Sequence, residues 1–381
     1  IALAELSKIK KDYLSAVNFY MDAYKVEPSR IELLESAGRY ALQLKNKTKA
    51  RNIFKDLSLQ NPSQENYINI YSELAIQSKS YKEAISHLQK LLSDNGESSN
   101  LKANIGILHH ASGDSVKGKN ILRDLFDKKE LNAQYSLSLF EIYFDSKDNL
   151  SAAKISDDII TSFPEDWRGY YSRSLVFMDE NEYKAAINII DPVSETFSNI
   201  FSIQYILGLC YSRIKMSDEA INFYNRAITI RPNSKNVLHS IAILYDEIGE
   251  WIKSDKIYDQ LIKNNPNDAQ AYNNYAYSLV ERNQDLQRAL SYAKKAINLE
   301  PENPSFLDTI GWAYYKMNDI KKARTFIEKS IEIQGDNSVV LEHLGDILMK
   351  FNDSAKALVL YKKAYGLDKE NPQLKKKAYP D

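Results

Sequence analysis

Apolar positions along the chain repeat with a period of about 34 residues, and the smallest of them mark the period most clearly. One set consists of Ala16, Ala50, Ala84, Gly118, Ala152, Ala186, Ala220, Ser254, Ala289, Ala323 and Ala357, with one step that is a residue longer before Ala289. A second set, each member shortly before one of the first, contains Gly38, Ser72, Gly106, Ser174, Gly208, Ala242, Ala276, Gly311 and Gly345, and Phe140 is its bulky exception. Because two antiparallel helices approach closely only where side chains are small, each pair of small residues predicts the crossing point of two helices.

The same register predicts where each helix begins and ends. Proline cannot continue a helix, and it ends second helices at Pro28, Pro62, Pro164, Pro232, Pro266 and Pro301. First helices are predicted to begin near Ile31, Glu65, Ser99, Ala133, Trp167, Phe201, Lys235, Ala269, Pro304 and Ser338. The pattern therefore predicts an all-α chain of stacked antiparallel helix pairs, which is a superhelical solenoid.

The register divides the chain into three segments. Residues 1–30 form an incomplete first unit, residues 31–365 form ten complete units in one continuous solenoid, and residues 366–381 form a short polar cap. A joint near residues 128–131 is the alternative to an unbroken array. The chain begins inside a helix and without methionine, so we expect the natural protein to continue upstream, where a signal, a lipid-anchor cysteine or another domain would lie.

The charge balance disfavours two classes of partner. The 381 residues include 50 basic and 51 acidic ones, a net charge of -1, so no basic excess draws the chain to nucleic acid or to anionic lipid. No apolar run reaches the length that spans a bilayer, so we expect no direct membrane insertion by this chain. A single cysteine, Cys210, excludes an internal disulfide.

Motifs that carry chemistry are absent from the sequence. It contains no glycine-rich phosphate loop, no HExxH zinc motif, no GxSxG elbow and no paired CxxC. His109 and His110 would point about 100° apart on a helix, which is a poor arrangement for gripping one metal ion. Cys210 is predicted to be a small buried residue, and His239 and His343 are isolated on their helices. We therefore expect no metal, no cofactor and no enzymatic activity.

The whole chain resembles the tetratricopeptide repeat superfamily, whose unit is a helix pair of this length. Its C-terminal part is similar to bacterial repeat proteins of the cell envelope, including outer-membrane lipoproteins that act as adaptors; the similarity lies in LDTIGWAYYK at Leu307 to Lys316 and EHLGDIL at Glu342 to Leu348. The resemblance implies a bacterial scaffold that is periplasmic or anchored to the outer membrane, with a cytoplasmic location as the alternative.

In this superfamily the first helices line a concave face, and the resemblance implies which side chains point into it. The candidate partner-binding residues are Asn236, His239, Asp246, Asn273, Tyr277, Asp308, Trp312, Tyr315 and Glu342. Carboxylates outnumber cations at these positions, so the groove is predicted to be acidic and to bind a protein or peptide with a basic segment. Its aromatic side chains are typical of interface anchors, so replacing Trp312 with alanine is expected to weaken partner binding by about 2 kcal/mol with little loss of fold.

These observations favour a non-catalytic scaffold or adaptor that belongs to a larger complex and holds a protein or an extended peptide in its concave groove. Two alternatives remain open at this point. In the first alternative, the chain is the recognition arm of an enzyme whose catalytic domain lies upstream of Ile1. In the second, it is a structural subunit of a secretion or motility assembly.

Overall fold

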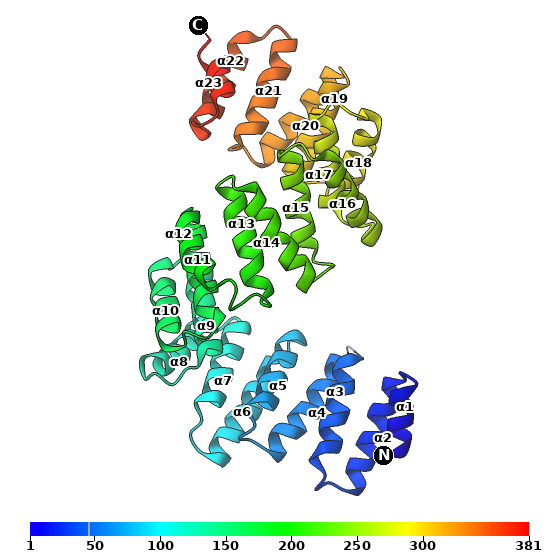
Figure 1. Cartoon of the computed structure of the whole chain (residues 1–381), viewed down its shortest axis with the longest axis vertical. Helices are drawn as coiled ribbons and strands as arrows, with labels where there is room; N and C mark the ends of the chain where they lie inside the picture. Colours follow the sequence, from blue (N-terminus) through cyan, green and yellow to red (C-terminus); the bar gives the residue numbers. More distant parts are fainter. Residues whose placement is uncertain (45, 381) are drawn as a thin grey trace. The chain divides into compact units, whose positions relative to one another are not determined.

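The computed structural model describes residues 1–44 and 46–380, in which helices are the only regular elements. They comprise 23 α-helices, labelled in Figure 1, and one short 3-10 turn. The chain divides into two compact units, Ile1–Phe197 and Ser198–Asp381. The prediction of an all-α fold of helix pairs is confirmed, whereas the prediction of one continuous array with a joint near 128–131 stays a prediction.

The first unit is built from α1 to α12, which pack as successive antiparallel pairs. Their bounds are α1 Ala2–Ile9, α2 Tyr13–Val26, α3 Ile31–Gln43, α4 Lys47–Gln60, α5 Glu65–Gln77, α6 Tyr81–Asn95, α7 Ser99–Ala111, α8 Ser115–Asp127, α9 Ala133–Asp145, α10 Asn149–Ser162, α11 Trp167–Asp179 and α12 Tyr183–Ile190, followed by the 3-10 turn Asp191–Val193.

The second unit is built from α13 to α23 in the same manner. Their bounds are α13 Phe201–Arg213, α14 Ser217–Ile230, α15 Lys235–Glu247, α16 Trp251–Asn264, α17 Ala269–Glu281, α18 Leu286–Leu299, α19 Pro304–Lys316, α20 Ile320–Ile333, α21 Ser338–Lys350, α22 Ser354–Leu367 and α23 Pro372–Ala378. Every first helix from α3 to α21 begins at the residue that the register of the sequence predicts.

Acidic and amide side chains fix the start of most second helices. An Asp or Asn at the N-cap accepts a hydrogen bond from a free backbone N–H of the first turn, which stabilises the helix end. This cap recurs at the period of the sequence, at Asp12, Asn46, Asp114, Asp148, Asp285, Asp319 and Asp353.

The small residues lie where the two helices of a pair cross, as predicted. A Cβ added at Gly311 of α19 would lie 2.7 Å from Cγ1 of Ile327 on α20, and one at Gly208 would lie 2.4 Å from the ring of Tyr224. At Gly118 of α8 the obstacle is backbone, because an added Cβ would lie 2.5 Å from the carbonyl oxygen of Gly106. A side chain at Gly311 or Gly208 would therefore require its neighbour to shift, and one at Gly118 would require the helices themselves to move.

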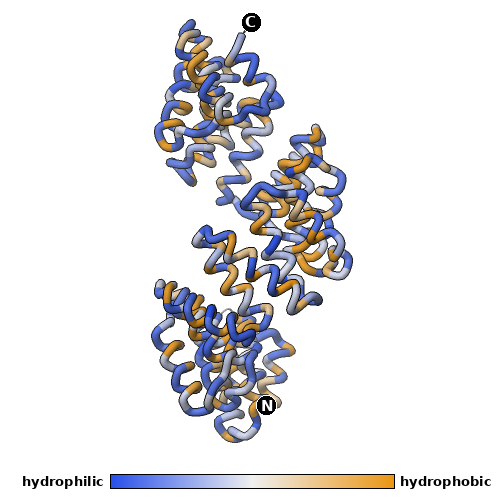
Figure 2. The backbone as a smooth tube through the Cα atoms, turned by 90° about the vertical axis from the view of Figure 1, so that its left-hand side faces the viewer, coloured by the Kyte–Doolittle hydropathy of each residue, from blue (hydrophilic) through white to orange (hydrophobic). Residues whose placement is uncertain are grey.

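The apolar positions form the cores between helices. Figure 2 shows hydrophobic and hydrophilic residues alternating along the helices. Alanines of the periodic set, such as Ala16, Ala152 and Ala323, are fully buried. Phe140 is buried too, and it stacks on Phe144 with ring centroids 5.3 Å apart. Each helix packs mainly against helices one or two places away along the chain.

Among the described residues, the turn inside a helix pair contains a left-handed residue at one register position. Lys79, Gly113 and Lys147, which stand at the same place in successive repeats, have φ angles of 54°, 96° and 61°. Glycine adopts this conformation at low cost and lysine at a higher one. The period of the sequence thus extends to the backbone angles of the turns.

The C-terminal segment 366–381, predicted to be a polar cap, contains α23. This helix begins one full repeat after α21, and its Leu374 and Ala378 are buried in the last core. Its apolar residues therefore keep the register of the repeats. Lys377, within this segment, forms ion pairs with two side chains of α21.

Candidate binding groove

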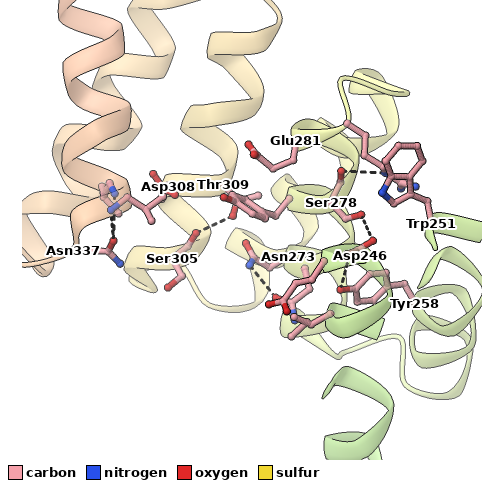
Figure 3. Close-up of a pocket in the computed structure, with 17 residues that line it drawn as sticks. Asp246, Trp251, Tyr258, Asn273, Ser278, Glu281, Ser305, Asp308, Thr309 and Asn337 are labelled. Carbon is pink, nitrogen blue, oxygen red and sulfur yellow. Dashed lines mark hydrogen bonds between the residues drawn. The ribbon is translucent and has the colours of Figure 1, made fainter. Parts of the chain in front are cut away.

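A groove of about 730 Å³ lies in the second unit, against its first helices. The side chains that line it come from α15, α16, α17, α19 and the start of α21 (Figure 3). They are Ile243, Asp246, Glu247, Trp251, Tyr258, Asn273, Asn274, Tyr277, Ser278, Glu281, Arg282, Ser305, Asp308, Thr309, Asn337, Val339 and Val340. Four of these carry a carboxylate and one carries a guanidinium, so acidic groups outnumber basic ones in the groove.

Asp246, near the end of α15, is held by two neutral donors. The Tyr258 hydroxyl donates to its Oδ2 at 3.1 Å, and the Ser278 hydroxyl donates to its Oδ1 at 2.8 Å (Figure 3). Burial raises the pKa of this carboxyl, and the hydroxyl donors and the charge of Arg282 oppose that shift only in part. Within the described part of the chain, no ammonium or guanidinium group forms an ion pair with Asp246.

The side-chain oxygen of Asn273 on α17 is a hydrogen-bond acceptor that receives no hydrogen bond from the described residues. Its side chain is 7% exposed, and its Nδ2 donates to Oδ1 of Asn274 at 3.4 Å. Its own Oδ1 is buried and has no hydrogen-bond partner among the described residues. A buried amide oxygen that lacks a donor costs free energy, so this position favours a ligand that brings an N–H group.

A stack of aromatic rings on α19 and α21 fixes two carboxylates of the groove. The Trp312 ring lies between those of Tyr315 and His343, with centroid distances of 4.5 and 3.9 Å. Nε1 of Trp312 donates to Oε1 of Glu281 at 2.6 Å, and Nδ1 of His343 lies 2.8 Å from Oδ1 of Asp308. The orientation of Glu281 and of Asp308 therefore depends on packing between consecutive helix pairs.

Two further carboxylates on α21 bind a lysine of the chain itself. Nζ of Lys377 lies 2.8 Å from Oε1 of Glu342 and 2.7 Å from Oδ1 of Asp346. The Tyr361 hydroxyl also donates to Asp346 at 2.7 Å, and its ring centroid is 5.5 Å from the lysine nitrogen. Burial lowers the pKa of Lys377, but its hydrogen bonds with the two carboxylates raise it by more, so the net shift is upward.

Comparison with known families connects these helix pairs to a described repeat. Sequence profiles of the tetratricopeptide repeat match residues 201–234, 257–291, 305–337 and 340–371. These segments are tetratricopeptide repeats. They include most of the residues that line the groove.

Curated relatives share such repeats over longer stretches. The TPR repeat-containing protein MJ1428 of Methanocaldococcus jannaschii is 22% identical over 329 residues, which cover 83% of this chain and 48% of that protein. The TPR repeat-containing protein PA4667 of Pseudomonas aeruginosa is 28% identical over 85 residues, which cover 22% of this chain and 14% of that protein. The chain thus matches half or less of the length of these relatives.

Two solved structures share the fold. A tetratricopeptide repeat protein from Parabacteroides merdae gives a TM-score of 0.57 at 14% identity, over 65% of this chain and 97% of that one. The APC/C hetero-tetramer Cut9–Hcn1 gives 0.51 at 10% identity, over 99% of this chain and 88% of that one. Tetratricopeptide repeat proteins are generally non-catalytic scaffolds for protein–protein interaction, because stacked repeats present extended binding surfaces.

The tetratricopeptide first helices bring part of the predicted site together. Of the nine candidate residues, those in the groove lining are Asp246, Asn273, Tyr277 and Asp308. Those outside it are Asn236, His239, Trp312, Tyr315 and Glu342. Burial raises the pKa of the Tyr277 hydroxyl, and the nearby carboxylates raise it further, so this phenol stays protonated.

Two candidate residues serve packing, which corrects their predicted exposure. Trp312 is 7% exposed, so it offers little surface to a partner, and its removal is not expected to spare the fold. His239 is 5% exposed, and its Nε2 lies 3.3 Å from Oδ2 of the buried Asp268. Burial lowers the pKa of His239, although its interaction with Asp268 opposes that shift.

Sequence reasoning missed Trp251, which lines the groove from a second helix. It is the first residue of α16, and its side chain is 45% exposed. The prediction considered only first helices, whereas the turn between α15 and α16 brings Trp251 to the same groove as Asp246. A tryptophan at a helix start, away from the packing positions of the repeat, was the available signal.

Other kinds of site find no support in the described residues. Within 1–44 and 46–380, no group of three or more His, Cys, Asp or Glu side chains is placed to hold a metal ion. No described helix combines the length and the apolar character that crossing a bilayer requires.

Cys210 is fully buried, as predicted, and burial raises the pKa of its thiol to about 12. The thiolate is the reactive form, so we expect the native protein to react with iodoacetamide much more slowly than the urea-unfolded chain at a pH near the usual thiol pKa. Mass spectrometry of the adduct measures both rates. Equal rates in the two states would contradict the buried position.

Proposed function

We propose that this protein is a non-catalytic scaffold or adaptor that binds a protein segment in extended conformation within the groove of its second unit. The observation that carries the proposal is the combination of an acidic lining with the donorless Oδ1 of Asn273. A protein segment brings backbone N–H groups along its whole length, so it satisfies such an acceptor whatever its sequence.

The charges of the groove support a basic segment as the preferred partner. Asp246 and Glu281 accept hydrogen bonds only from neutral donors in the described structure, so their negative charges are available to a cationic partner. Arg282, the one cation in the lining, is already bound to Asp255 at 2.7 Å. A complementary positive segment would gain both association rate and specificity.

The proposal includes the cellular location of this scaffold and its membership of a complex. The resemblance of Leu307 to Lys316 and of Glu342 to Leu348 to envelope repeat proteins supports an adaptor in a bacterial envelope complex. The fold that the chain shares with a protein of the Cut9–Hcn1 hetero-tetramer is consistent with membership of a larger complex.

Panning a phage library of random linear peptides against the whole chain tests the proposed binding. Ser305 is exposed, lines the groove and stands in the first turn of α19, so Ser305→Trp should fill the groove without disturbing the fold. Ser354→Trp places the same side chain at an exposed site in the first turn of α22, outside the groove lining, and is the matched control.

We expect enriched peptides to lose binding to Ser305→Trp and to keep it with Ser354→Trp, as measured by fluorescence anisotropy of the synthetic peptides. If no peptide is enriched, or if Ser305→Trp binds the enriched peptides as tightly as the control, the groove is not the binding site and the proposal is wrong.

A further inference from the structure

We propose that the groove holds a lysine or arginine side chain of the bound segment, with its cationic group hydrogen-bonded to Asp246 and lying against the indole of Trp251. This inference rests on the proposed function, because it assigns a specific contact within the same groove. It names the side chain that the site selects, whereas the proposed function requires only that a protein segment binds there.

The first argument is the kind of donor that surrounds Asp246. The donors around its two oxygens are all neutral hydroxyls: those of Tyr258 and Ser278 at hydrogen-bond distance, with the hydroxyl of Ser254 beside them. A charged donor forms the strongest bond with a carboxylate, above all where the site is partly withdrawn from water. The position therefore suits an ammonium or guanidinium group better than a neutral donor.

The second argument is the exposed ring of Trp251 in the same lining. Tryptophan is the aromatic side chain that attracts cations most strongly through its face. The guanidinium carbon of Arg282 already lies 5.9 Å from this ring. Arg282 does not take the place of the ligand, because its side chain is 6% exposed and is held by Asp255 and by the backbone oxygen of Ser278.

Asn273 provides an independent sign that the groove is built for a ligand. Its side chain is more than nine-tenths buried, yet Oδ1 has no donor within the described residues. A backbone N–H of the bound segment would satisfy Oδ1 while the cationic side chain reaches Asp246. The two sites together suit a segment with a basic residue and an available amide, as a peptide provides.

The second unit already shows a lysine bound by this kind of chemistry. Lys377 is held by two carboxylates of a first helix, Glu342 and Asp346, with the ring of Tyr361 nearby. The groove offers a similar set, with Asp246 as the carboxylate and Trp251 as the ring. The site of Lys377 therefore shows that carboxylates and an aromatic ring of this repeat array can bind a lysine side chain.

A double-mutant cycle tests the assignment directly. The probes are peptides enriched by the whole chain and lost on Ser305→Trp, each synthesised with its lysine or arginine residues and with glutamine in their place. They are titrated into the wild type, Asp246→Asn, Trp251→Ala and Asp218→Asn. Asp218 is exposed on α14, outside the groove lining, and gives the same charge change as a matched control.

We expect replacement of one basic residue by glutamine to weaken binding to the wild type and to Asp218→Asn by about tenfold, and to Asp246→Asn by less than about twofold. Trp251→Ala should weaken the basic peptide by about threefold. Circular dichroism melts check that all variants are folded.

Two results would overturn the inference while leaving the proposed function intact. One is groove-dependent binding by peptides without lysine or arginine. The other is a glutamine effect of the same size in Asp246→Asn and in the wild type. The proposed function itself fails only at the earlier step, if no peptide depends on Ser305, and the inference then fails with it.

Discussion

Replacing Trp312 with alanine should lower the free energy of unfolding by about 3–5 kcal/mol, the usual cost of removing a buried tryptophan. The ring is packed on both faces, by Tyr315 at 4.5 Å and by His343 at 3.9 Å between centroids. Its loss would open a cavity between consecutive repeats and leave Glu281 without its donor. Urea unfolding followed by far-ultraviolet circular dichroism measures the change.

Trp312→Phe separates packing from hydrogen bonding. Phenylalanine keeps an aromatic ring in the stack but cannot donate to Glu281, so we expect a smaller loss of about 1–2 kcal/mol. If Trp312→Ala unfolded at the same urea concentration as the wild type, the packed position would be contradicted. The prediction from the sequence, an exposed Trp312 that anchors a partner, would then hold.

Replacing Gly118 with alanine should destabilise the first unit by about 2–3 kcal/mol, although only one methyl group is added. The added Cβ would lie 2.5 Å from the carbonyl oxygen of Gly106 and 2.7 Å from the backbone nitrogen of His110. Backbone atoms cannot turn aside as a flexible side chain can, so α7 and α8 would have to separate. Urea unfolding with a probe placed in the first unit measures the loss.

Gly366 provides the matched control, because it is also a helical glycine but has no atom within 4 Å of its ideal Cβ. Alanine forms helix better than glycine, so Gly366→Ala should be neutral or should stabilise α22 by up to about 1 kcal/mol. The same substitution is thus expected to act in opposite directions at the two sites. Destabilisation of equal size at both would show that contact at the crossing point is not the cause.

The helices could be predicted from the sequence because each repeat must satisfy the same packing condition. A small residue at the crossing and a proline after the second helix fix the register, and the first helices from α3 to α21 begin where this register places them. The register also indicated that Asp246, Asn273 and Asp308 share one face, since they stand on consecutive first helices and line one groove.

What could not be predicted depends on contacts between residues of different repeats. The burial of Trp312 comes from His343, on the next first helix along the chain, and from the particular rotamers that let the two rings stack. The neutralisation of Glu342 comes from Lys377, in the segment that was predicted only to be a polar cap. The periodic pattern gives the direction in which a side chain leaves its helix, but it does not say which neighbour the side chain meets there.

The preference of each helix for neighbours one or two places away has a consequence for biosynthesis. Such a chain has low contact order, so the entropy lost in closing each loop is repaid within one or two repeats. Folding can then nucleate at whichever repeat is most stable and spread to adjacent ones. Each helix pair can therefore acquire its native contacts as it leaves the ribosome, before the residues that complete the groove have been synthesised.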